Sequence, residues 1–243
     1  PADLEPILKN NNIDGCIAVQ ADQSEEETKF LLDLANQYSF IKGVVGWVDL
    51  QNINVEERLK YFSKNPLFKG VRHIVQAEAK GFMLQESFIN GISRLEKFNL
   101  VYEILIYPNQ LEEAIEMVKK FPNQKFVLDH IAKPKISENL DINWRKNIET
   151  LASYKNVFCK LSGLVTETDD FKWKYKDFTP FLDVVYNAFG SDRLLFGSDC
   201  PVCLLAAKYE EVYQIIDKYT SKLPLAEREK ILGKNAINFY ILN

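Results

Sequence analysis

Polar side chains of the types that hydrolases use stand at the ends of several apolar segments. Asp199 ends the run LLFGSD, and His130, one of only two histidines, lies in FVLDHIAKP. Arg72 and His73 are neighbours in KGVRHIVQ, and Tyr107 lies at the end of VYEILIY. A carboxylate can move a proton, while imidazole, guanidinium and phenol groups can hold an oxyanion. These residue types therefore point to hydrolysis, with Asp199 and His130 as candidate catalytic residues.

Asp199 and His130 also have purely structural alternatives. Asp199 could cap a helix or form a turn, and His130 could be a buried, hydrogen-bonded imidazole. Arg72 and His73 are adjacent on one strand, so only one of them can point into the molecule's centre. We expect Arg72 to point inward.

Two lysines and a cysteine pair carry weaker signals. Lys133 and Lys160 could donate hydrogen bonds to a substrate, or they could form salt bridges near the strand ends. Cys200 and Cys203 form a single CxxC without a second pair, so loop packing is favoured over a zinc site. The aromatic segment 171–175 (FKWKY) suggests a lid over the site.

Seven short apolar segments, separated by amphipathic helical segments, could position these side chains. The expected strands are Cys16–Gln20, Val44–Asp49, Gly70–Val75, Val101–Tyr107, Lys125–Ile131, Val157–Gly163 and Leu194–Asp199. They are apolar on both faces and start roughly 30 residues apart, as in a parallel sheet built of βα units. A helix over Asp3–Asn10 precedes the first strand. An open doubly wound sheet is the alternative to a barrel, but no GxGxxG follows an early strand, so its dinucleotide-binding form gains no support. The pattern favours an α/β fold, a (β/α)8 TIM barrel lacking its first strand, with residues 1–243 as one domain.

Composition narrows the possible partners and compartments. The 243 residues are 47% hydrophobic and 26% charged, and the formal net charge is -4, so we expect no nucleic-acid partner. We find neither a membrane-spanning run nor a signal peptide, and we expect no membrane partner. Four cysteines are too few for a disulfide scaffold, so we expect a cytoplasmic protein.

Several motifs, taken in order, resemble those of a known family. VVGWVDL, KGVRHIVQ, LIYPNQL, FVLDHIAKP, VFCKLSGLVTE, LLFGSDCPVCLLAA and ILGKNAINFY together resemble the amidohydrolase-related (amidohydrolase 2) family. Within it, the chain looks most like the sugar lactonases typified by L-fuconolactonase and L-rhamnonolactonase. The resemblance covers essentially the whole chain.

The resemblance implies a barrel of the metal-dependent hydrolase type that opens a lactone, here a sugar aldonolactone. Asp199 matches the family's aspartate at the end of the last strand and is expected to activate water. His130 matches the family's mid-chain histidine. Arg72 and, more loosely, Tyr107 match substrate-binding positions, and Lys133 is a further expected substrate contact. We expect a small-molecule substrate, and a homo-oligomer is compatible with the sequence.

The chain departs from the family at its start and after Asp199. Cys200 stands where the family usually has Trp. The family's first strand carries a His-x-His pair, and this chain has no histidine before His73. If one divalent metal such as zinc is bound, His130 and Asp199 are its expected ligands, and two ligands do not make a tight zinc site. Either an N-terminal segment is missing or the protein is a degenerate member; we expect the former, because a missing strand exposes two sheet edges.

Two alternatives to lactone hydrolysis remain open. One is metal-dependent amide hydrolysis or decarboxylation within the same superfamily. The other is a catalytically silent barrel that binds a sugar acid. Sensitivity to chelators separates the first alternative from a metal-free lactonase, and ligand-induced stabilisation without turnover identifies the second.

Overall fold

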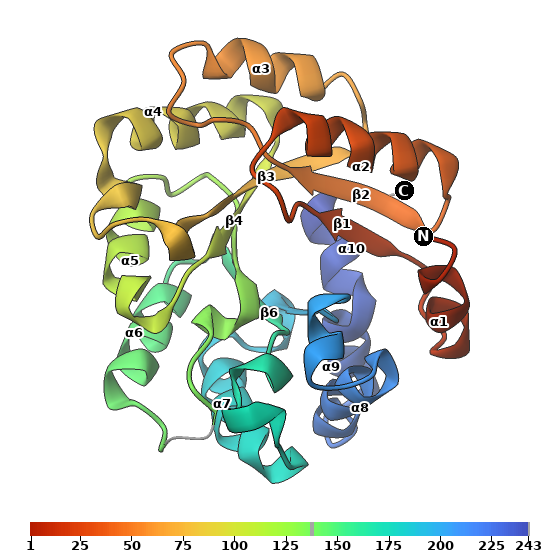
Figure 1. Ribbon diagram of the computed structural model, residues 1–243. Helices are drawn as coiled ribbons and strands as arrows, with labels where there is room; N and C mark the ends of the chain where they lie inside the picture. Colours follow the sequence, from red (N-terminus) through yellow and green to blue (C-terminus); the bar gives the residue numbers. More distant parts are fainter. Residues whose placement is uncertain (137–138, 243) are drawn as a thin grey trace.

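A computed structural model describes residues 1–136 and 139–242 and contains a sheet of seven parallel strands. Each strand pairs with the next one along the chain, so the sheet follows chain order (Figure 1). The strands are β1 (Cys16–Val19), β2 (Ile41–Gly46), β3 (Phe68–Ile74), β4 (Val101–Leu105), β5 (Phe126–Leu128), β6 (Val157–Leu161) and β7 (Leu194–Phe196). The parallel α/β fold expected from the sequence is confirmed.

All seven expected strands are present, and each ends one to three residues earlier than expected. The segment Val101–Tyr107 contains β4 only as far as Leu105, and Lys125–Ile131 contains β5 only as far as Leu128. After each of these strands the chain leaves the ladder while an apolar side chain, Ile106 or Ile131, is still buried. Apolar content therefore marks burial more closely than it marks strand ends.

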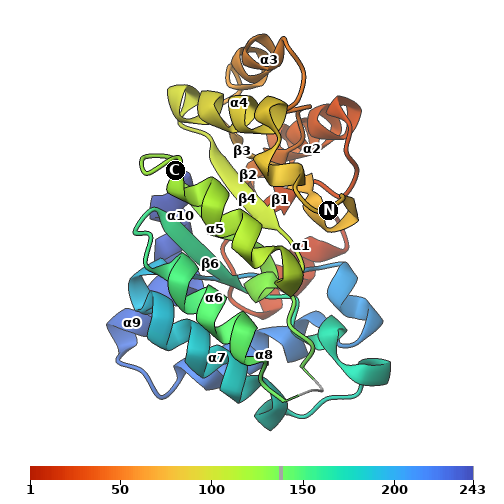
Figure 2. The same cartoon turned by 90° about the vertical axis from the view of Figure 1, so that its left-hand side faces the viewer.

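Helices connect the strands, and most of them cover the outer face of the sheet. They are α1 (Leu4–Asn10), α2 (Glu25–Gln37), α3 (Val55–Phe62), α4 (Glu86–Leu95), α5 (Leu111–Lys119), α6 (Ile142–Ala152), α7 (Tyr175–Phe189), α8 (Tyr209–Thr220), α9 (Leu225–Glu229) and α10 (Asn235–Tyr240). Along one side, α5 packs on α6 and α6 packs on α7 (Figure 2). Helices α2 to α8 each bury side chains along one stripe, as the 3.6-residue spacing predicts.

The interior of the curled sheet forms a small core of its own. Val45, Val101 and Val127 pack there against Phe239 and Tyr240 of α10. Lys69, at the start of β3, donates a 2.8 Å hydrogen bond from its ammonium group to the carbonyl of Ile241. Lys125, just before β5, donates one of 3.4 Å to the carbonyl of Phe239. Helix α10 therefore covers the N-terminal ends of the strands and leaves their C-terminal ends for a site.

The first and last strands form the two edges of the sheet that the structure describes. Helix α1 precedes β1, as the sequence predicts for a barrel without its first strand. In residues 1–136 and 139–242, we find no helix with the length and apolar content needed to span a membrane.

Candidate active site

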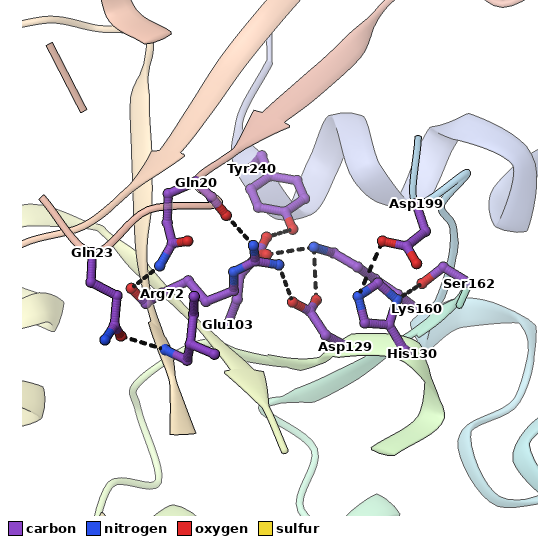
Figure 3. Close-up of polar contacts among 11 residues, drawn as sticks. Gln20, Gln23, Arg72, Glu103, Asp129, His130, Lys160, Ser162, Asp199 and Tyr240 are labelled. Atoms are coloured by element: carbon purple, nitrogen blue, oxygen red, sulfur yellow. Dashed lines mark hydrogen bonds and ion pairs between the residues drawn. The ribbon is translucent and has the colours of Figure 1, made fainter. Parts of the chain in front are cut away.

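Asp199 and His130 meet at the C-terminal ends of β7 and β5. The Oδ1 atom of Asp199 lies 3.6 Å from Nε2 of His130 (Figure 3). On its other side, His130 places Nδ1 2.8 Å from the hydroxyl of Ser162, which follows β6. The side chains of Asp199 and His130 are 14% and 9% exposed. The structure thus brings the two expected catalytic residues together in a mostly dry place that solvent can still reach.

An unusual backbone turn holds His130 in place. His130 and the three residues after it all have positive φ angles, between 49° and 62°, and Asp199 has a φ of 56°. This left-handed region is rare for residues with a side chain, and it costs free energy that the surrounding structure must offset. The indole of Trp144, on α6, donates a 2.9 Å hydrogen bond to the carbonyl of Ile131 and anchors the turn. Strained residues of this kind concentrate at functional sites.

Gly163 allows the turn to pack closely against the end of β6. Its φ is +66°, and a Cβ built on it would lie 2.7 Å from the Cβ of His130. Real Cβ atoms do not come that close, so this glycine is required both by its backbone angle and by the space beside His130. The sequence KLSGL thereby supplies the hydroxyl that orients the imidazole and the glycine that makes room for it.

Burial keeps the imidazole neutral. It lowers the pKa of His130 to about 4, although the carboxylates of Asp199 and Asp129 act in the opposite direction. At neutral pH His130 therefore carries one N–H and one acceptor nitrogen. The Oδ2 atom of Asp199 is buried and has no hydrogen-bond partner among the described residues. A neutral imidazole and an unpartnered carboxylate oxygen thus lie side by side.

A network of two buried carboxylates and two largely buried cations fills the interior beside this pair (Figure 3). Lys160, on β6, bridges Glu103 of β4 at 2.5 Å and Asp129 at 2.9 Å. Arg72, on β3, pairs with Asp129 at 3.0 Å. The hydroxyl of Tyr240 donates to Glu103. Two cations face two anions, so the network is neutral as a whole.

The charges in this network set each other's protonation. Burial alone would raise the pKa of Asp129, but Lys160 and Arg72 hold it well below its usual range. Burial would lower the pKa of Lys160, but Asp129 and Glu103 raise it. Burial and the neighbouring Asp129 raise the pKa of Glu103. Lys160 is therefore salt-bridged, one of its two expected roles, and it lies inside the barrel instead of at its rim.

The predicted orientation of Arg72 is confirmed. Its guanidinium points into the interior, where it donates to Asp129 and to the carbonyl of Gln20. His73 points outward, stacks on Phe82 and lies 2.8 Å from Glu78. Because two of its N–H groups are already engaged, Arg72 acts in this structure as part of the network below Asp199. Its binding to substrate stays a prediction.

Two other expected substrate contacts, Lys133 and Tyr107, lie in the loops after β5 and β4. Lys133 ends the left-handed turn that begins at His130, and its ammonium is 3.7 Å from the carboxylate of Glu167. Tyr107 lies in the loop after β4 and is 44% exposed. In the segment expected to form a lid, Trp173 donates a hydrogen bond to the carbonyl of Ala206 and packs on Phe178. That indole links two loops beyond the C-terminal ends of the strands.

A metal ion would find an incomplete set of ligands here. His130 and Asp199 offer two donors, and within residues 1–136 and 139–242 no group of three His, Cys, Asp or Glu side chains is arranged to hold a metal. Zinc sites take three or four protein ligands. The residues present therefore do not complete a zinc site. Cys200 and Cys203 are free thiols.

Three residues of the site escaped the analysis of the sequence. Glu103 is a single charge in the otherwise apolar strand VYEIL, and a lone charge there could have indicated a buried ionic partner. Tyr240 reaches the interior from the C-terminal helix, and Glu167 lies in a loop. Nothing in the local sequence around either residue indicates its distant partner.

Comparisons with known proteins agree on one family. The family model described as Amidohydrolase matches residues 1–242. L-fucono-1,5-lactonase of Burkholderia multivorans is 36% identical over 257 aligned positions, which cover 100% of this chain and 86% of that protein. L-rhamnono-gamma-lactonase of Scheffersomyces stipitis is 27% identical and covers 79% of this chain and 66% of its own length.

A solved structure gives the same result. The crystal structure of an amidohydrolase from Burkholderia multivorans with bound zinc has a TM-score of 0.95 and 37% identity, covering 100% of this chain and 88% of that one. It shares the whole described fold with this protein. The family match, the identity to the lactonases and this structural similarity lead to one conclusion: the chain belongs to the amidohydrolase family.

Proposed function

We propose that the protein hydrolyses a lactone ring of a sugar acid, with Asp199 activating the attacking water. The observation that carries this proposal is the unpartnered Oδ2 of Asp199, buried beside a neutral His130 at the C-terminal ends of the strands. The similarity to L-fucono-1,5-lactonase over the whole chain supports the substrate class.

The reaction needs two proton transfers, one from water to Asp199 and one from Asp199 to the leaving ring oxygen. Asp199 takes a proton from water as the water oxygen attacks the lactone carbonyl, and it returns that proton to the ring oxygen that leaves. With the hydroxyl of Ser162 donating to Nδ1, the Nε2–H of His130 is free to stabilise the oxyanion. Atoms balance, because one water is consumed and one hydroxy acid forms.

The ion network under Asp199 contributes by being rigid and neutral. Arg72, Asp129, Lys160 and Glu103 hold the floor of the site in place and add no net charge beneath the reacting carboxylate. Preorganised dipoles in a mostly dry site stabilise developing charge without having to reorient. We propose that Arg72 also contacts the substrate through its remaining N–H groups, as do Tyr107 and Lys133.

A divalent metal such as zinc is the second part of this proposal. The similar Burkholderia structure with bound zinc supports it, and His130 and Asp199 would be the ligands that this chain supplies. Since these two do not complete a zinc site, no step above depends on a metal. A metal-dependent amide hydrolysis or decarboxylation is the competing function that such a metal favours.

We also propose a cytoplasmic location and a small-molecule substrate. All four cysteines are unpaired thiols, which suits a reducing compartment. The net charge of -4 provides no cationic field for nucleic acid.

The test is the Asp199→Asn variant, assayed for acid release on a panel of aldonolactones, with and without a chelator. We expect kcat to fall by at least about 1,000-fold while the lactone still stabilises the variant against heat. Asp192→Asn is the matched control, because Asp192 is exposed and pairs only with Lys230 among the described residues. Near-parental turnover by Asp199→Asn would refute the assignment. Loss of the parental lactonase activity with chelator would support the metal that forms the second part of this proposal, whereas a parental protein inactive on every lactone would favour the amide hydrolase or decarboxylase.

A further inference from the structure

A second ion pair, of Lys133 and Glu167, lies at the edge of the site. Lys133 ends the turn after β5, and Glu167 lies in the loop after β6. The ammonium nitrogen and the carboxylate oxygen Oε1 are 3.7 Å apart, and the two side chains are 17% and 18% exposed. Neither residue has a part in the hydrolysis step described above.

Both members of this pair lie within electrostatic reach of the reacting residues. The charge of Lys133 acts on His130, and the charge of Asp199 acts on Glu167. The amide of Ile136 donates a 2.9 Å hydrogen bond to the carbonyl of Glu167 and so ties together the two loops that carry the pair. Lys133 and Glu167 therefore extend from loops whose backbones are joined close to the reacting pair.

The geometry of the pair differs from that of the buried network. Lys160 donates a hydrogen bond to Glu103 at 2.5 Å and forms an ion pair with Asp129 at 2.9 Å, both closer contacts than that of Lys133. At 3.7 Å, Lys133 and Glu167 are too far apart for a hydrogen bond. The ammonium keeps donors to offer and the carboxylate keeps acceptors to offer, in a place with limited access to water.

A donor and an acceptor side by side match the chemistry of a hydroxyl group, which both accepts and donates. We propose that Lys133 and Glu167 form a subsite for one ring hydroxyl of the lactone, which accepts from Lys133 and donates to Glu167. This inference rests on the proposed lactone hydrolysis. It makes Glu167 a residue that determines specificity for hydroxylated over deoxygenated lactones.

The test is a cycle that combines protein variants with substrate analogues. The parental protein and Glu167→Gln are assayed for kcat/KM on an aldonolactone and on its monodeoxy analogues, each lacking one ring hydroxyl. For one analogue, the loss of kcat/KM caused by Glu167→Gln and the loss caused by removing the hydroxyl should not add. Glu167→Gln should lower kcat/KM about 100-fold on the full lactone but less than about 5-fold on that analogue. Glu112→Gln is the matched control, because Glu112 is an exposed glutamate on α5.

The outcomes separate failure of the Lys133–Glu167 subsite from failure of the proposed lactone hydrolysis. Losses that add at every ring position in a folded Glu167→Gln variant overturn the subsite while leaving lactone hydrolysis intact. If Glu167→Gln does not fold, Lys133→Met serves in the same cycle with the same expectation. Failure of the parental protein to hydrolyse any lactone overturns the proposed function and the subsite together.

Discussion

Replacing Lys160 by Met should destabilise the protein strongly, because it removes one of the two cations in the buried network. Lys160 contacts Glu103 and Asp129 at 2.5 and 2.9 Å, and both carboxylates are fully buried. The change leaves two anions facing Arg72 alone, so the interior acquires a net negative charge. Breaking a buried ion pair on one side costs about 3–5 kcal/mol.

The loss should be visible as a lower melting temperature that also depends on pH. For a protein of this size, about 4 kcal/mol corresponds to a decrease of about 8–16 °C. Lys160 normally lowers the pKa of Glu103, so its removal raises that pKa further. A carboxyl with a raised pKa binds more protons in the folded state than in the unfolded state, so stability falls as pH rises. The variant should therefore lose more stability at pH 8 than at pH 5.

A compensating variant makes this reasoning refutable. Glu103→Gln combined with Lys160→Met restores a neutral interior and keeps an acceptor for the hydroxyl of Tyr240. We expect the double variant to recover about 2 kcal/mol relative to Lys160→Met alone, measured by thermal or urea unfolding. A double variant no more stable than the single one, or a single variant with the parental melting temperature, would refute the argument from charge balance.

Two further predictions concern the turn at His130. Burial lowers the pKa of His130 to about 4, so the pH profile of kcat/KM should show no ionisation of this histidine between pH 6 and 8. Activity should fall only as pH approaches 4. A limb near pH 6.5 in the parental enzyme that disappears in His130→Asn would contradict this prediction. The same shift makes the folded state bind fewer protons than the unfolded state, so this histidine lowers stability as pH falls from about 6.5 to 4. Gly163→Ala should cost about 1–3 kcal/mol by calorimetry and reduce kcat, because its Cβ would lie 2.7 Å from that of His130 at a φ of +66°; an alanine variant with parental stability and kcat would show that the turn does not need this glycine.

Much of the fold could be predicted from the sequence because it depends on local apolar patterns. The seven strands, the amphipathic helices between them and the helix before the first strand all follow from runs and periods of hydrophobic residues. Strand ends were less predictable: β5 stops at Leu128, and the left-handed turn that follows contains the buried Ile131 and Ala132. Apolar content does not distinguish a buried strand from a buried turn.

Part of the site could be predicted in the same way. Parallel strands place their C-terminal residues at one end, so Asp199 and His130 were expected there. Alternation along β3 predicted that only one of Arg72 and His73 faces inward, and the structure shows that it is Arg72, as expected. The roles of Tyr107 and Lys133 as substrate contacts remain predictions. What escaped prediction were the partners: Asp129 for Arg72, Ser162 for His130 and Glu167 for Lys133.

The sequence by itself determined which residue types stand at the strand ends and which elements carry them, because hydrophobic periodicity and strand alternation are local properties of the chain. Only the tertiary structure decided how the charges combine. Glu103 and Lys160 are 57 residues apart in the chain and Tyr240 lies 137 residues beyond Glu103, yet they share one network in the interior. Burial and Coulomb interactions act through space and not along the chain. The neutrality of His130 and the open gap between Lys133 and Glu167 therefore appear only once the sheet has curled and its loops have met.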